Sequence, residues 1–149
     1  MERTYVMVKP DGVQRGLIGD IISRIERRGL KIIAMRMNTI TRGRAQEHYA
    51  EHLEKPFFQD LIDFMTSGPS LSMVVEGENA MRIMRAINGA TKPVEAAPGT
   101  IRGDLAIDTG RNVVHGADSN ESAEREIKIH FTDDEITEYT RVDEEWVYE

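Results

Sequence analysis

The order of strand-like and helix-like segments predicts a sandwich of the α/β or α+β class, in which helices cover one face of a sheet. Residues 4–9 have the Tyr- and Val-rich composition of a short strand, and isoleucines from Ile18 to Ile25 recur at helical spacing. Gly29 ends that helix, and residues 31–39 continue as a second strand. A strand, a helix and a strand within so short a span are typical of a layered sandwich.

The next part of the chain predicts two helices, a third strand and a further helix. Thr41 is a candidate N-cap for a helix through Glu54, and a second helix follows Pro56, so the two form a helical hairpin. The third strand is expected at residues 71–76, before a helix that ends at Gly89.

Regular patterns stop in residues 89–111, which contain four glycines and two prolines. Connections of this length in a compact domain are usually functional or disordered. A last short strand is predicted at residues 113–114, and a helix at 122–130 follows it. Asp118 and Glu121 have the spacing of a capping box for that helix.

Length and composition predict one domain over residues 1–149 and exclude several classes of function. Hydrophobic residues make up 40% of the chain and charged residues 30%, as in soluble globular proteins. The absence of cysteine excludes disulfides, thiolate metal sites and cysteine nucleophiles. A net charge of −7 argues against a nucleic-acid partner. Because neither a membrane span nor a signal pattern is found, we expect a cytoplasmic protein with no membrane contact.

The irregular stretch and the residues after it, from Thr91 to Asp118, are the richest in chemistry. Cations, hydroxyls and glycines alternate there, and this composition suits a polyphosphate because arginine forks and backbone N–H groups bind phosphate oxygens. Neither a P-loop nor a Rossmann fingerprint occurs in the chain. On composition alone, a surface loop with solvated charges remains the alternative.

His115 is a candidate nucleophile at the end of this segment. A neutral imidazole can accept a phosphoryl group and release it again, provided that a second group orients the ring. Asp118 and Glu126 are the candidates for that second group. A lone histidine more often has a structural or surface role, so that alternative also stays open at this point.

The sequence predicts no catalytic or metal-binding role for the other three histidines. His48 and His52 have the i, i+4 spacing of helical zinc ligands, but Tyr49 stands where metalloprotease helices have glutamate, so we interpret the pair as part of a solvated helix face. His130 ends a helix, where a cationic imidazole interacts favourably with the helix dipole.

Five motifs occur in order along the chain, at residues 8–13, 56–58, 67–69, 98–104 and 112–119. Together they resemble the nucleoside diphosphate kinase family, and the resemblance covers essentially the whole chain. The most specific motif is the last one, Asn-Val-Val-His-Gly-Ala-Asp-Ser, which is similar to the family signature around its phosphorylated histidine.

The resemblance implies a ferredoxin-like α+β sandwich, with a four-stranded antiparallel sheet, helices covering it and a long nucleotide-facing loop. It implies transfer of the γ-phosphoryl group from a nucleoside triphosphate, typically ATP, to nucleoside diphosphates through a phosphohistidine on His115. This ping-pong reaction maintains the NTP and dNTP pools. Mg²⁺ is the implied cofactor, carried by the nucleotide phosphates and not by protein ligands. The implied assembly is a homohexamer, with a tetramer as the alternative.

The resemblance also assigns roles to individual residues. His115 is the nucleophile, Glu126 is the carboxylate near its imidazole, and Tyr49 supports the ring. The nucleotide contacts, grouped by what they touch, are Lys9 and Asn112 for the sugar hydroxyls and the neighbouring phosphate, Arg85, Thr91, Arg102 and Lys55 for the phosphates, and Phe57 and Thr109 for the two faces of the base. Lys9 counts among the catalytic residues as well.

Two departures from the family pattern leave a second function open. Ala117 stands where the signature commonly has serine, and Lys55 where the family often has arginine. The alternative is therefore a nucleotide-binding or scaffold protein that no longer catalyses phosphoryl transfer. Because His115, Arg85 and Arg102 are all retained, we favour the active enzyme.

Overall fold

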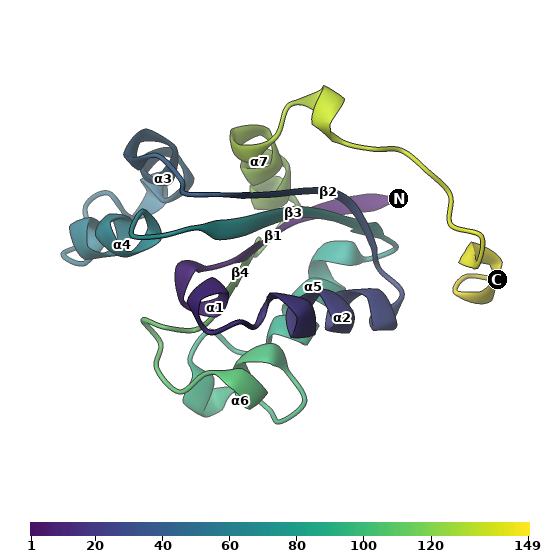
Figure 1. Cartoon of the computed structure of the whole chain (residues 1–149), viewed down its shortest axis with the longest axis horizontal. Helices are drawn as coiled ribbons and strands as arrows, with labels where there is room; N and C mark the ends of the chain where they lie inside the picture. The colour runs from purple at the N-terminus through teal and green to yellow at the C-terminus, as the bar shows by residue number, and fades with distance from the viewer.

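Four antiparallel strands form the centre of the molecule, in the spatial order β2-β3-β1-β4 (Figure 1). A computed structural model describes residues 1–149, and its strands are β1 (Glu2–Val8), β2 (Lys31–Asn38), β3 (Ser70–Gly77) and β4 (Val114–Gly116). In the register of the sheet, β1 pairs along its full length with β3, and Met7 of β1 lies opposite His115 of β4. This order confirms the ferredoxin-like α+β sandwich.

Helices cover both faces of the sheet, so the prediction of one covered face is wrong (Figure 1). One face carries α2 (Ile18–Arg28), α5 (Ala80–Asn88) and α6 (Ile101–Leu105), and the other carries α3 (Arg42–His48), α4 (Phe58–Met65) and α7 (Asn120–His130). The physical reason lies in the central strands. Val6 and Val8 of β1 enter one core cluster while Tyr5 and Met7 enter the other, so the strand is buried on both sides.

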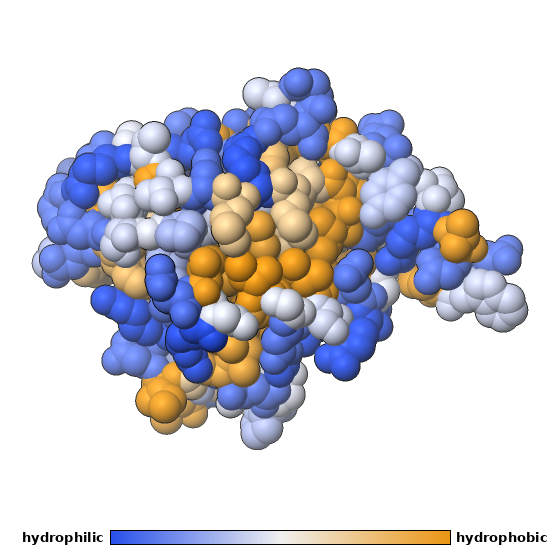
Figure 2. All heavy atoms as spheres, viewed as in Figure 1, coloured by the Kyte–Doolittle hydropathy of each residue, from blue (hydrophilic) through white to orange (hydrophobic).

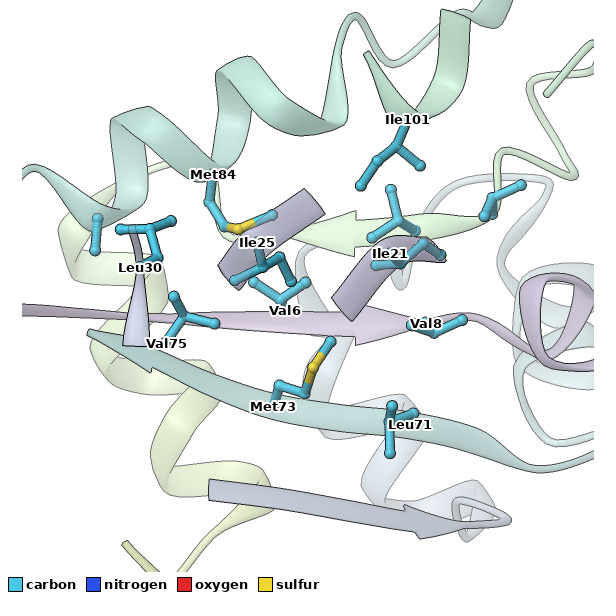
Figure 3. Packing of buried hydrophobic residues seen from close by; sticks show 13 residues of the cluster. Val6, Val8, Ile21, Ile25, Leu30, Leu71, Met73, Val75, Met84 and Ile101 are labelled. Atoms are coloured by element: carbon cyan, nitrogen blue, oxygen red, sulfur yellow. The ribbon is translucent and has the colours of Figure 1, made fainter. Parts of the chain in front are cut away.

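The first of these clusters shows how helices and sheet lock together. Ile21 and Ile25 of α2, Met84 of α5 and Ile101 of α6 lie on the same side of the sheet as Val6 of β1 and belong to one cluster with it (Figure 3). All five side chains are at most 1% exposed. Burial of one such side chain contributes about 1.5–3 kcal/mol, so this packing fixes the sheet against which the functional loop is built.

Helix ends follow local capping chemistry. Gly29 ends α2 in the left-handed conformation, at φ 106°, and the Thr41 hydroxyl accepts the Arg44 backbone N–H at the start of α3, both as predicted. The N-cap of α7 is Ser119, whose hydroxyl accepts the Ser122 N–H at 3.0 Å, and not Asp118. The two candidates are adjacent polar residues, and the backbone selects the extended Ser119 as the cap.

The segment 89–111 is less irregular than the sequence predicts, because it contains α6 and a 3₁₀ turn at Pro93–Glu95. The Thr100 hydroxyl caps α6 by accepting the Gly103 N–H at 3.0 Å. A side chain at Gly103 has no space, since a Cβ there would lie 2.0 Å from the Ala97 carbonyl oxygen. A helix of five residues is too short for an apolar period to show in the sequence.

The remaining elements are a short helix α1 (Pro10–Gln14) and 3₁₀ turns at Ala50–His52, Asp133–Glu135 and Glu144–Trp146. The C-terminal tail lies along the body through Arg141, whose guanidinium donates to the Gly29 carbonyl at 2.8 Å. Trp146 on the same tail remains 84% exposed. None of the helices is both long enough and apolar enough to cross a membrane.

Candidate active site

A pocket of about 600 Å³ opens beside strand β4, between α3, α4, α5 and the 89–111 segment. It brings together all but one of the residues that the sequence assigns to a site, namely Lys9, Tyr49, Phe57, Arg85, Thr91, Arg102, Thr109, Asn112, His115 and Glu126. The exception is Lys55, which is exposed in the turn before α4 and does not line the pocket. Its phosphate contact therefore remains a prediction.

His115 is placed by a strained turn at Val113, directly before β4. Val113 has φ 73°, a left-handed conformation that β-branched residues avoid, and the Val114 N–H donates to the Asn112 carbonyl at 2.8 Å across it. The Asp11 carboxylate accepts the Val113 N–H at 3.0 Å, and the Val113 carbonyl accepts the Lys9 N–H at 2.9 Å. Strain of this kind costs about 1–3 kcal/mol and is found where surrounding contacts fix a functional residue.

The imidazole of His115 is held through one nitrogen only. Its Nε2 lies 2.5 Å from Oε1 of Glu126 and 3.2 Å from Nε2 of His48. Its Nδ1 has no protein partner and is not enclosed. The Glu126 side chain is 5% exposed and that of His115 is 21% exposed, so the ring reaches the pocket while its carboxylate partner lies behind it. When the Nε2–H of the ring donates a hydrogen bond to Glu126, the lone pair of Nδ1 is available for a nucleophilic attack.

His48 belongs to the site, and its interpretation as a solvated residue is wrong. The side chain is buried, and its Nδ1 lies 2.8 Å from Nε2 of His130. Burial lowers the pKa of His48 well below the usual value, with a smaller effect from the neighbouring His115 and His130 rings. Ala45 and His48 stand three residues apart and share the buried face of α3, and this periodicity is the sequence signal that could have placed it.

His130 is also buried, and the prediction of a cationic ring at the helix end is wrong. Burial lowers its pKa to about 3, and the nearby Arg44 and Arg36 act in the same direction, so the ring is neutral at physiological pH. The ring stacks on Tyr5 with 4.5 Å between centroids. Packing against a central strand thus outweighs the helix dipole at this position.

The tyrosine predicted to support the nucleophile is in place. Tyr49 is 9% exposed, and its ring meets that of His115 edge-on at 6.2 Å between centroids. Burial raises the pKa of Tyr49, and the charge of Glu126 adds to that effect, so its hydroxyl stays protonated.

Four cations line the pocket without a carboxylate partner: Lys9, Arg85, Arg102 and Arg111. Arg102 is 3% exposed, and burial together with the charge of Arg85 lowers its pKa to about 10. Burial lowers the pKa of Lys9 to about 8, against a smaller opposing effect of Asp11. Positive groups gathered in a partly buried pocket with no negative partner favour a polyanionic ligand.

Hydrogen bonds to the backbone and to one another hold these groups in place. Arg102 donates to the carbonyls of Gly89 at 2.9 Å and Val114 at 2.6 Å, and so ties the end of α5 to the strand that carries His115. Lys9 Nζ donates to Oδ1 of Asn112 at 2.8 Å, and the Asn112 amide donates to the Thr91 carbonyl at 3.0 Å. The cationic wall is therefore organised before any ligand binds.

The outer end of the pocket carries a residue that the sequence analysis did not assign. Arg111 lies with its guanidinium 3.9 Å from the ring centroid of Phe64, and its position next to Asn112 in the signature motif is the signal that could have found it. Phe57, which is 48% exposed, and the exposed Thr109 also line this end. An exposed aromatic face at the mouth of a cationic pocket is suited to stacking with a flat ring.

A histidine held by a carboxylate, inside a pocket whose cations lack partners, defines a phosphotransferase that acts on nucleotides. Comparison with known proteins gives the particular family. The family model for nucleoside diphosphate kinase matches residues 2–136. Relatives named nucleoside diphosphate kinase, from Methanosarcina barkeri and Methanococcoides burtonii, are 69% and 68% identical over 149 residues, with 100% of each chain covered.

Solved structures agree with the sequence relatives. A halophilic nucleoside diphosphate kinase from Halobacterium salinarum, solved in complex with CDP, is 53% identical and has a TM-score of 0.97, with 99% of each chain covered. A nucleoside diphosphate kinase family protein from Babesia bovis is 49% identical and also has a TM-score of 0.97, with 99% of this chain and 100% of that chain covered. The chain belongs to the nucleoside diphosphate kinase family.

Proposed function

We propose that His115 carries the phosphoryl group when this chain transfers it from a nucleoside triphosphate to a nucleoside diphosphate. Its Nδ1 attacks the γ-phosphorus, the bond from that phosphorus to the bridging oxygen breaks, and the diphosphate leaves with the electron pair. The Nε2 proton stays on the ring, where the charge of Glu126 stabilises the imidazolium-like phosphohistidine. A second diphosphate takes the group in the reverse sequence of steps, so one pocket serves donor and acceptor in turn.

The pairing of His115 with Glu126 is the observation that carries this proposal. The contact at Nε2 fixes the tautomer, and the nitrogen opposite to it is the one without a protein partner. Tyr49 and His48 pack against the ring and limit its rotation. A nucleophile that is already oriented loses little entropy on reaching the transition state.

The cations around the nucleophile are suited to the triphosphate. Arg85 and Arg102 stand on the side of β4, and Lys9 with Asn112 stands at the end of β1, next to the strained Val113 turn. In phosphoryl transfer, the transition state is stabilised mainly by positioned cations and donors. We expect Thr91 to add a neutral donor to the same set.

We propose Mg²⁺ as part of the nucleotide substrate. The carboxylate that contacts the nucleophile, Glu126, is already engaged with His115, and the cations Lys9, Arg85 and Arg102 line the same pocket. Mg²⁺ requires oxygen ligands and keeps several waters, which the phosphate oxygens of the nucleotide accommodate. The protein residues here therefore bind the phosphates, and the phosphates hold the metal.

We propose that Phe57 stacks on the base and that Thr109 lies on its opposite face. Stacking on an aromatic ring tolerates any base because every base has a π-face. We therefore expect one pocket to accept several nucleoside diphosphates. We also expect the chain to form a single domain over residues 1–149 and to act in the cytoplasm.

We propose that the chain assembles as a homohexamer, with a tetramer as the alternative. Strand β2 is an edge of the sheet, and Met35 and Met37 on it are 47% and 52% exposed. Figure 2 shows apolar side chains gathered around this strand. Val94, Ile107 and Trp146 are exposed as well. Several separate apolar surfaces suit an assembly with more than one kind of contact, and sedimentation equilibrium distinguishes six copies from four.

Intact mass spectrometry after incubation with ATP and Mg²⁺, without an acceptor, tests the assignment of the nucleophile. We expect one acid-labile phosphoryl adduct on the wild type and none on His115→Gln, and addition of GDP should remove the adduct. His52→Gln is the matched control, because His52 lines the same pocket but does not contact His115. Folded wild-type protein that binds nucleotide without forming an adduct would instead support the scaffold function, with Ala117 and Lys55 as the first residues to change.

A further inference from the structure

Three potential metal ligands converge at the inner end of the pocket. Nε2 of His48, Nε2 of His115 and Oε1 of Glu126 all lie within 4.8 Å of one another. Their separations are 2.5 Å from His115 to Glu126, 3.2 Å between the two histidines and 3.7 Å from His48 to Glu126. All three residues line the pocket, so the cluster can be reached from solvent.

We propose that this His-His-Glu cluster binds a divalent transition-metal ion of the zinc type, and that the bound ion inhibits the enzyme. Tetrahedral zinc, with bonds of about 2.0–2.2 Å, requires ligand atoms about 3.3 Å apart. The observed separations of 2.5, 3.2 and 3.7 Å bracket this value, so small side-chain shifts suffice. Because all three residues line the pocket, water can supply a fourth ligand.

The surroundings of the ligands also fit a metal site. A histidine that binds a metal normally donates its other ring N–H to a fixed acceptor, which orients the ring. Nδ1 of His48 lies 2.8 Å from Nε2 of His130 and has this arrangement. On the carboxylate, Oε2 of Glu126 faces Arg125 at 3.9 Å, which leaves Oε1 for the metal.

The donor set selects against Mg²⁺, the ion that the nucleotide brings. Two imidazoles and one carboxylate suit zinc, copper or cobalt, whereas Mg²⁺ prefers an octahedral shell of oxygens. Because the cluster presents only one oxygen ligand, millimolar Mg²⁺ should not occupy it. A transition-metal ion can therefore bind in the presence of the normal substrate.

Inhibition follows from the proton on the His115 ring, and this part of the inference rests on the proposed function. A neutral imidazole carries one proton, and metal binding at Nε2 requires the lone pair there. The proton of Nε2 must then move to Nδ1, the nitrogen that attacks the γ-phosphorus. The nucleophile loses its lone pair, and Glu126 exchanges its hydrogen bond to the ring for a bond to the metal.

Metal binding is measured first on metal-free protein without nucleotide, by equilibrium dialysis with Zn²⁺ and by the visible absorption of Co²⁺. We expect one ion per chain, a Co²⁺ spectrum of the intense tetrahedral type, and an affinity at least tenfold lower in His48→Gln. The control His52→Gln should bind like the wild type, because His52 lines the pocket outside the cluster. Equal affinity in His48→Gln and wild type would overturn the assignment.

A measurement on the wild type covers the case in which His48→Gln does not fold. Nuclear magnetic resonance of the four histidine rings should show Zn²⁺ shifting His48 and His115, with His52 unchanged. Shifts confined to His52 would overturn the site. In a single-turnover experiment, protein preloaded with one Zn²⁺ should form the phosphoryl adduct at least tenfold more slowly than metal-free protein.

The two proposals fail in different ways. If zinc binds the cluster but adduct formation keeps its rate, the inhibitory role is wrong and the nucleophile assignment stands. If metal-free protein forms no adduct, the nucleophile assignment fails, while the dialysis and resonance results still decide the metal site.

Discussion

Acidification should destabilise the folded chain through His130. Burial lowers the pKa of this ring to about 3, whereas the unfolded chain has the ordinary value of 6.5. Between these two values, the unfolded state binds one proton that the folded state does not bind. Stability is therefore complete above pH 6.5 and decreases as the pH falls toward 3.

The size of the effect follows from the difference in bound protons. Each pH unit below 6.5 costs about 1.4 kcal/mol per histidine of this kind, so His130 should cost about 2 kcal/mol at pH 5. His48, whose pKa is also lowered by burial, acts in the same direction and over the same range below 6.5. A loss of about 2 kcal/mol from His130 alone is a large fraction of the 5–15 kcal/mol that stabilises a typical domain.

Urea unfolding at fixed protein concentration, at pH 7.5, 6.5, 5.5 and 5.0, measures this dependence. His130→Phe keeps a ring that can stack on Tyr5 but has no titratable group. We expect the variant to lose about 2 kcal/mol less than the wild type between pH 7.5 and 5.0, whatever its stability at neutral pH. If both proteins lose the same amount, His130 is not buried in its neutral form and the reasoning is wrong.

Three further predictions concern the site. Burial lowers the pKa of Lys9 to about 8, so its positive charge is lost above that pH. Nucleotide affinity should then fall by up to tenfold per pH unit above 8 in the wild type but not in Lys9→Met, and calorimetry from pH 7 to 9.5 checks this. Ala117→Ser should speed phosphorylation about two- to tenfold by a hydrogen bond to Glu126, and an unchanged rate in quench-flow would show the hydroxyl to be dispensable. Asp11→Ala should cost about 1–3 kcal/mol in urea unfolding and slow adduct formation, because the buried Val113 N–H loses its acceptor; normal values of both would contradict this role.

The sequence alone was sufficient for the four strands and for some helix caps, and it selected His115 as the proposed nucleophile. The helix predicted from Thr41 through Glu54 ends at His48, because the chain turns there into a 3₁₀ turn. Apolar periods and caps such as Thr41 and Gly29 act within a few residues, so they can be identified without knowing the fold. The ordered motifs around Lys9 and His115 indicated the family, and the structure brings all but one of the predicted site residues into one pocket. Lys55 remains outside it.

Only the tertiary structure decided what surrounds the nucleophile. His48 and His130 stand 82 residues apart in the chain, and their 2.8 Å contact exists because α3 and α7 pack on the same face of the sheet. The strain at Val113 likewise depends on Asp11, which lies 102 residues away. Local patterns determine which segments form helices and strands, whereas the protonation state of a buried ring depends on solvent exclusion and on charges that only the folded chain brings together.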